Sequence, residues 1–210
     1  MKALAINGSA RKNGNTAALL KSALEGSASV GAETSLVHLY DLNYRGCTGC
    51  VACKLLGGSS FGSCAQRDDL TQILEQAKNA DVLFLGSPMY FNDVTGQLRG
   101  FFERFLFPAI TYTKERVILY PKRVSVGLCF TSNAPGSFYT DFYERLKNTF
   151  THIIGPAEYV EASETWQFDD YSKYAADMFD VEARLKRHLE VFPEDCKKAY
   201  EMGRRLASAQ

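Results

Sequence analysis

Short apolar runs alternate with longer amphipathic stretches along most of the chain, and this alternation restricts the fold more than any other feature. Five runs are predicted as β-strands: Lys2–Ile6, Ser35–Leu39, Val82–Gly86, Val124–Phe130 and Glu158–Val160. Helical spacing of apolar residues is found between them at Thr16–Leu24, Leu70–Ala77, Gln97–Phe107 and Phe138–Phe150. Strands that alternate with helices are typical of α/β proteins with a doubly wound parallel sheet and helices on both faces. We therefore expect a five-stranded parallel sheet.

Two of these runs belong in the middle of the sheet. Val82–Leu85 and Val124–Leu128 are apolar without clean alternation, as expected for strands covered on both faces. Beyond Glu161 the sequence becomes aromatic and charged, and Ser172–Leu189 and Pro193–Ala207 are predicted as helices. The length of 210 residues predicts a single domain, 1–210, with a C-terminal helical extension over about 171–210.

The charge balance argues against some classes of partner. Lys plus Arg and Asp plus Glu both number 24, so the formal net charge is zero. Such a chain has no overall field that attracts nucleic acid or an anionic membrane. The apolar run before Gly8 is too short for a signal peptide, and no later run is long enough to span a bilayer. We expect a soluble, cytoplasmic protein without nucleic acid or membrane partners.

A loop rich in Gly, Asn and Ser, Asn7–Thr16, joins the first strand to the first helix. A strand, a polar loop and a helix N-terminus together form an anion site, because unpaired amides and the helix dipole face the ligand. Side-chain donors are available from Ser9, Arg11, Lys12, Asn15 and Thr16. The loop contains neither G-x-G-x-x-G nor a final Gly-Lys-Ser/Thr, which argues against a Rossmann dehydrogenase or an NTPase. The alternative is a polar turn before a well-capped helix.

Two further motifs, Gly86–Phe91 and Gly96–Arg104, follow this loop in order. Together the three motifs resemble the NAD(P)H-dependent FMN reductase family, which includes the iron-sulfur flavoproteins, from Lys2 to about Arg104. The resemblance implies a flavodoxin-like fold with FMN at the carboxyl ends of the strands, where doubly wound sheets place their ligands. It also implies a set of residues for the FMN phosphate: Ser9, Arg11, Asn13, Asn15 and Thr16.

Two more loops are predicted to contact the flavin ring. Ser87-Pro88 predicts a sharp turn at a strand end, because proline restricts its own dihedral and the residue before it. By the resemblance, the residues that border the isoalloxazine ring are Pro88, Met89, Tyr90 and Phe91, and Asn92 continues this cofactor-binding loop. Aromatic and thioether side chains suit a flat polarizable ring, although they also suit a core or a subunit interface. In a third loop, hydroxyls and amides of Thr131, Ser132 and Asn133 are expected at the pyrimidine edge of the ring.

Four of the six cysteines are clustered. Cys47, Cys50 and Cys53 are spaced by two residues each, and Cys64 follows after ten more. Four close thiolates complete an iron-sulfur or tetrahedral zinc site. The pattern resembles the cluster loop of iron-sulfur flavoproteins, but its last interval is longer and is rich in glycine. Three interpretations stay open: a 4Fe-4S cluster on these four residues, zinc, or structural and redox thiols.

The resemblance implies an FMN-dependent oxidoreductase that takes a hydride from NAD(P)H. The reduced flavin is then expected to pass electrons to a quinone, free flavin, another small acceptor or a metal centre. Since the flavin carries the chemistry, no catalytic side chain is predicted, and the scattered His38, His152 and His188 are expected to be structural or exposed. One alternative is an iron-sulfur flavoprotein that exchanges electrons with a redox carrier protein. Another is a non-enzymatic flavodoxin-type carrier or redox sensor. The resemblance further implies a homodimer or homotetramer.

Overall fold

The computed structural model describes residues 1–209, which form one parallel sheet between two layers of helices. The strands are β1 (Lys2–Asn7), β2 (Glu33–His38), β3 (Val82–Pro88), β4 (Ser125–Thr131) and β5 (Ala157–Ala162). Their order is β2-β1-β3-β4-β5, and every pairing is parallel. In this register Ala5 lies between Leu36 of β2 and Phe84 of β3. The predicted flavodoxin-like, doubly wound sheet is confirmed.

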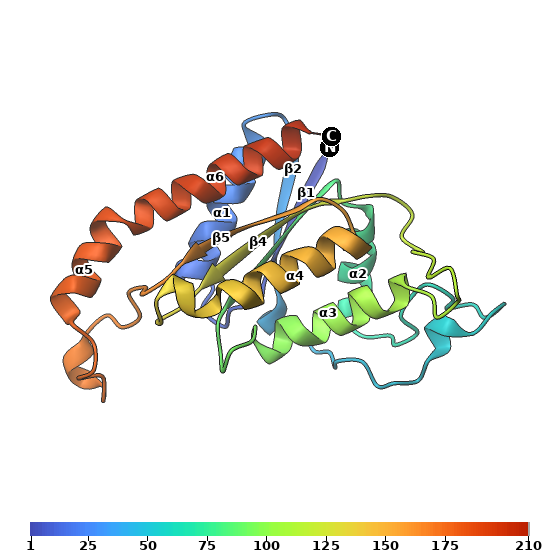
Figure 1. Cartoon of the computed structure of the whole chain (residues 1–210), viewed down its shortest axis with the longest axis horizontal. Coiled ribbons are helices and arrows are strands. Elements are labelled where there is room, and N and C mark those ends of the chain that lie inside the picture. The colour runs from blue at the N-terminus through green and yellow to red at the C-terminus, as the bar shows by residue number, and fades with distance from the viewer. Residues whose placement is uncertain (210) are drawn as a thin grey trace.

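Residues 1–209 contain six α-helices, five of which pack on the sheet while α5 lies at one end of the molecule (Figure 1). They are α1 (Asn15–Ala28), α2 (Leu70–Asn79), α3 (Gly96–Ala109), α4 (Thr140–Ile153), α5 (Val181–Glu190) and α6 (Phe192–Ser208). Helices α1 and α6 cover one face of the sheet, whereas α2, α3 and α4 cover the other. Among residues 1–209, no helix combines the length and the apolar character that crossing a membrane requires.

The central strands β3 and β4 divide the hydrophobic core into two halves, one on each face of the sheet. Every residue of β4 is buried, and β3 is buried up to Ser87, because both strands carry helices on both faces. Leu83 and Leu85 point toward α2 and α3, while Val82 and Phe84 point toward α1 and α6. This burial confirms the central position predicted for both strands.

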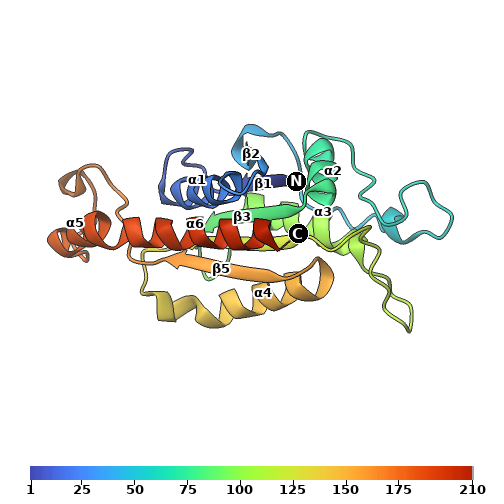
Figure 2. The same ribbon diagram turned by 90° about the horizontal axis from the view of Figure 1, so that it is seen from above.

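The C-terminal extension differs from its prediction at one end. The predicted helix Ser172–Leu189 is wrong over 172–180, where the chain is irregular apart from a short 3₁₀ turn at Tyr171–Lys173. The helix begins later because the carboxylate of Asp180 accepts a hydrogen bond from Ala183 N–H at 2.9 Å and caps its first turn. Both views place α5 and the loop that contains Cys47–Cys64 at opposite ends of the molecule (Figures 1 and 2).

Glycines allow α1 and α6 to pack with their backbones in contact. A Cβ atom on Gly203 would lie 1.9 Å from Ala23 O, and one on Gly26 would lie 2.0 Å from Tyr200 O. Ser27 uses this proximity to donate a hydrogen bond to Gly203 O at 3.1 Å. The contact fixes α6, and therefore the end of the extension, against α1, the helix that follows the loop Asn7–Thr16, which we call the phosphate loop.

Gly203→Ala should destabilise the protein by about 2 kcal/mol or more, since the new methyl group meets backbone atoms that cannot rotate away. Urea unfolding followed by circular dichroism measures the change. Gly96→Ala is the control, because a Cβ atom there meets nothing within 4 Å. Equal stability of the two variants would contradict the close contact between α1 and α6.

Candidate functional site

The carboxyl ends of β1, β3 and β4 meet at one edge of the sheet, and hydrogen bonds join the loops that leave them. Gly8 N–H donates to Gly86 O at 2.8 Å, and Thr95 Oγ1 donates to Gly8 O at 2.6 Å. On the other side, the hydroxyls of Thr16 and Thr131 lie 2.8 Å apart in the interior. The three loops that the sequence assigned to FMN are therefore brought together.

Asn7, at the end of β1, organises the phosphate loop. Its buried side chain accepts a hydrogen bond from Ser9 N–H at 2.9 Å and donates to His38 Nδ1 at 3.0 Å. Burial lowers the pKa of His38, which favours the neutral ring that accepts this bond. Ser9 Oγ in turn accepts from Arg11 N–H at 3.1 Å. Asn7 belongs to the predicted loop, but this role was not predicted for it; its position at the end of a buried strand was the available signal.

The N-terminus of α1 presents free amides to this loop. The first hydrogen bond of the helix runs from Ala18 N–H to Gly14 O at 3.1 Å. The backbone amides of the three preceding residues therefore have no acceptor within the helix. Gly14 occupies the N-cap without a capping side chain, and the first turn contains no acidic residue. Such a helix end attracts an anion through its dipole and its unpaired donors. The well-capped helix considered as an alternative is not observed.

The predicted phosphate donors differ in what they already contact. Arg11 Nη1 donates to Gln167 O, and Asn15 Nδ2 donates to Trp166 O at 2.8 Å. Lys12 forms an exposed ion pair with Asp41 at 2.7 Å. Arg11, the other cation of the loop, has no carboxylate partner among residues 1–209. Asn13 is exposed, while Ser9 and Thr16 are buried.

The second loop makes a tight turn that exposes an aromatic ring. Tyr90 and Asp93 form two hydrogen bonds with each other, at 2.8 and 3.0 Å, around Phe91 and Asn92. Both central residues have positive φ, 50° for Phe91 and 64° for Asn92, which is rare for a bulky side chain. Phe91 is fully exposed and Tyr90 half-exposed, whereas Met89 is buried beneath them. The turn therefore holds a ring out at the sheet edge at a conformational cost, as binding loops do.

The third loop is anchored more firmly. Met89 N–H donates to Thr131 O at 2.9 Å, which joins the second and third loops. Thr131 and Ser132 are buried, and Ser132 Oγ donates to Ala134 O at 2.8 Å. The amide of Asn133 donates to the side-chain oxygen of Gln167.

These features fit FMN. A helix end with free amides and one arginine suits a phosphate, and an exposed aromatic turn beside a rigid loop of hydroxyls and amides suits a flavin ring. The individual contacts with FMN remain predictions.

The cysteine loop gives a different result for a metal cluster. Cys47 and Cys50 are exposed, Cys53 is buried and Cys64 is partly buried. Burial raises the pKa of the Cys53 thiol. Within residues 1–209, no three side chains of His, Cys, Asp or Glu are arranged to hold a metal ion. As folded here, the four predicted ligands do not fit a 4Fe-4S cluster.

Cys64 instead contacts the buried Arg104, which belongs to a predicted motif but had no predicted role of its own. Arg104 Nε donates to Cys64 Sγ at 3.3 Å, and Arg104 Nη1 donates to Asp68 at 2.6 Å and to Arg45 O at 3.0 Å. The Arg104 side chain has no exposed surface. Burial opposes ionisation of Asp68, but the hydrogen bond and charge of Arg104 outweigh it, so the pKa of Asp68 lies below its ordinary value. Arg104 thus joins both ends of the cysteine loop to α3.

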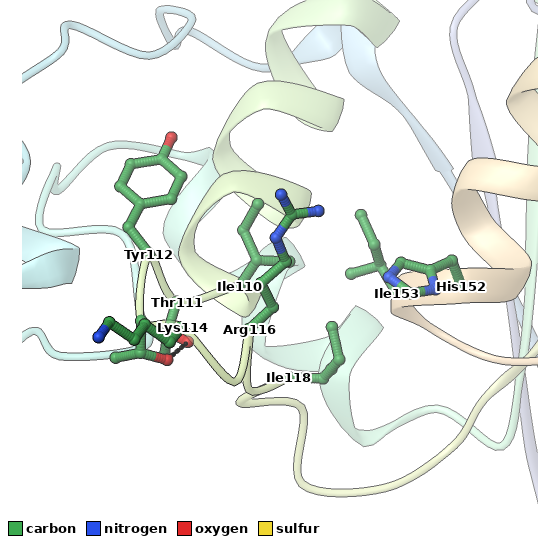
Figure 3. A pocket seen from close by; sticks show the side chains of 9 residues that line it. Ile110, Thr111, Tyr112, Lys114, Arg116, Ile118, His152 and Ile153 are labelled. Atoms are coloured by element: carbon green, nitrogen blue, oxygen red, sulfur yellow. Dashed lines mark hydrogen bonds between the residues drawn. The ribbon is translucent and has the colours of Figure 1, made fainter.

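A large open cavity lies away from the carboxyl edge. Its volume is about 690 Å³, and it is bounded by the segment after α3 and by the end of α4. Figure 3 shows Tyr112, Lys114 and Arg116 on that segment, with His152 and Ile153 on α4. Since α3 and α4 both run from the carboxyl to the amino edge of the sheet, this cavity is separate from the three loops.

The fold and the joined loops define a flavodoxin-like protein with an uncapped helix N-terminus at the carboxyl edge of its sheet. The sequence profile of the NADPH-dependent FMN reductase family matches residues 1–126, and the chain belongs to that family.

Relatives and solved structures agree with this class. An iron-sulfur flavoprotein from Methanocaldococcus jannaschii is 40% identical over 104 residues, which are 50% of this chain and 51% of the relative. The chain spans about half the length of the curated relatives it matches. The NAD(P)H:quinone oxidoreductase from Methanothermobacter marburgensis has a TM-score of 0.68 at 14% identity, with 98% of both chains covered. An FMN-dependent NADH-azoreductase from Bacillus anthracis, in complex with FMN, has a TM-score of 0.66 at 18% identity, with 98% of this chain and 99% of that chain covered.

Arg104→Met should destabilise the protein by about 3 kcal/mol at neutral pH, because the partly buried carboxylate of Asp68 then loses the fully buried partner of its charge. Urea unfolding measures the loss. Arg99→Met on the same helix is the control and should cost less than about 1 kcal/mol, since the Arg99–Asp93 pair is partly exposed.

The loss should also depend on pH. The folded pKa of Asp68 is depressed, so its ion pair stabilises the protein above the unfolded pKa and is lost as the pH falls through the folded value. The difference between wild type and Arg104→Met should therefore shrink below about pH 4. A difference that stays constant down to acid pH would mean that Arg104 acts through packing and not through Asp68.

Proposed function

We propose that the chain is an FMN-dependent NAD(P)H oxidoreductase whose electrons pass to a quinone, a flavin or another small acceptor. The observation that carries the proposal is the uncapped N-terminus of α1, with Arg11 beside it, at the same sheet edge as the exposed turn at Phe91. When bound there, FMN would supply the redox chemistry between reduced nicotinamide and the acceptor.

The residues of the chain bind and orient. Amides of the first turn of α1, with Ser9, Arg11, Asn15 and Thr16, hold the phosphate. Residues 88–92 border one side of the ring, and residues 131–133 supply polar groups to its pyrimidine edge. Because Phe91 and Tyr90 stand in solvent, a planar nicotinamide or acceptor can approach the ring beside them. One pocket then serves both half-reactions in turn.

A second candidate is an iron-sulfur flavoprotein, supported by the name of the curated relative and by the four clustered cysteines. The placement of the thiols speaks against it here, because Cys64 contacts Arg104 and the four side chains do not form a ligand set. We therefore favour electron transfer through FMN alone, with the thiols in structural or redox roles. A non-enzymatic flavodoxin-type carrier is the third candidate.

We also propose a cytoplasmic homodimer or homotetramer. Helix α5 contains no buried residue, and its apolar side chains at Val181, Leu185 and Leu189 are exposed and spaced by four, so they form one stripe. The opposite side of the helix contacts the body of the protein through Arg184 and Arg187. An apolar stripe that faces outward supports contact with a second subunit.

Replacing Asn15 and Thr16 together by Ala should weaken FMN binding about tenfold or more, since two donors at the helix end are lost. Titration of the apoprotein followed by flavin fluorescence measures the affinity. The control replaces Asn148 and Thr149, an identical pair on α4, far from the site. Thermal unfolding shows whether the loss of the Thr16–Thr131 bond has disturbed the fold, in which case Asn15→Ala alone tests the same prediction. Unchanged affinity in both would mean that the phosphate binds elsewhere.

Anaerobic purification with cofactor analysis separates the three candidate functions. We expect FMN without stoichiometric iron and sulfide, flavin absorbance that bleaches on addition of NADH or NADPH, and recovery of that absorbance with a quinone. Iron and sulfide in proportion to FMN would establish the iron-sulfur flavoprotein. Full FMN occupancy with no bleaching by either nucleotide would support the carrier.

A further inference from the structure

A short segment after β5 crosses the phosphate end of the candidate site. We call Thr165–Gln167 the strap. The chain leaves the sheet at Ala162 and turns at Glu164, whose φ of 51° is left-handed. The strap then lies against the loops that follow β1 and β4. It lies outside residues 1–126, which the family profile matches.

The strap holds two of the side chains that are assigned to the phosphate, Arg11 and Asn15. Asn15 Nδ2 donates to Trp166 O at 2.8 Å, and Arg11 Nη1 donates to Gln167 O. A guanidinium has five N–H donors in a planar fork, so one bond to a carbonyl leaves others for an anion. Arg11 can therefore contact the strap and a phosphate at the same time.

The other side of the strap is tied to the third loop. Thr165 N–H donates to Ser132 O at 3.0 Å, and the amide of Asn133 donates to the side-chain oxygen of Gln167. The hydroxyl of Tyr171 accepts a hydrogen bond from Gln167 N–H at 3.1 Å. The strap thus bridges the loops after β1 and β4, which are separated by more than 100 residues.

We propose that the strap closes the phosphate end of the FMN site and that Arg11 links it to the phosphate. The inference rests on the proposed function, since it requires FMN at this site. A phosphate between the helix end and Arg11 orients the guanidinium, and the oriented guanidinium holds Gln167 O. Riboflavin has the same ring and no phosphate, so it leaves Arg11 without this constraint. The strap therefore distinguishes FMN from riboflavin and slows release of the phosphorylated flavin.

Limited proteolysis by chymotrypsin tests the link between phosphate and strap. Trp166 and Phe168 lie in or beside the strap, and Tyr112, 74% exposed at the far edge, is an internal reference. FMN should slow cleavage at the strap about tenfold relative to the apoprotein, because fewer molecules open it. Saturating riboflavin should leave cleavage there within about twofold of the apoprotein, and cleavage at Tyr112 should not change. Equal protection by FMN and riboflavin would overturn the proposal.

The release rate of FMN supplies a second measurement. Gln167→Ala removes the bond from Asn133 to the strap and should release FMN about fivefold faster, with an association rate near that of wild type. Asp177→Ala, an exposed residue of the same connecting segment, is the matched control. Wild-type release from Gln167→Ala would overturn the strap while leaving the proposed function intact. Failure of the wild-type protein to bind FMN at all would overturn the proposed function and the strap with it.

Discussion

All strands of the sheet run in the same direction, and the rest of the structure depends on this constraint. Each connection between parallel strands returns through a helix, so every loop that leaves a carboxyl end lies on one edge. β2 lies on one side of β1, and the chain then crosses back to place β3 on the other side. The loops that leave β1 and β3 therefore turn in opposite directions between these two strands. The bond from Gly8 to Gly86 O joins the two loops at that point. The unpaired amides at the start of α1 and the exposed aromatic turn consequently lie at the same edge of the sheet.

The cysteine loop shows how a buried charge can organise an irregular segment. Arg104 occupies one of the most buried positions in the protein, and its donors are satisfied by Asp68, Cys64 Sγ and backbone carbonyls. An unpaired charge in this position would be costly, so the two ends of the loop are held in the places where they complete the network. The middle of the loop, which contains Leu55 and Leu56, remains exposed. The thiols that share a sequence motif are thereby divided between different environments.

The two halves of the chain have different roles at the candidate site. Residues matched by the family profile form the phosphate loop and the aromatic turn. The later residues add the third loop, the strap and the helices of the extension. Arg184 on α5 donates to Asn133 O at 2.7 Å, so the extension is attached to the site and not only to the sheet. A part of the chain with less family resemblance thus contributes to holding the cofactor loops in place.

Local patterns in the sequence determined the succession of strands and helices along the chain, the central position of β3 and β4, and the polar loop before α1. These features depend on hydrophobic period and on the properties of neighbouring residues, which a sequence contains directly. The start of α5 was predicted wrongly, because one capping hydrogen bond from Ala183 N–H to Asp180 decides it against a longer helical pattern. The contact of Arg104 with Cys64 and that of Arg11 with Gln167 join residues 40 and 156 positions apart. Only the tertiary structure decided these, since burial and long-range hydrogen bonds have no period along the chain.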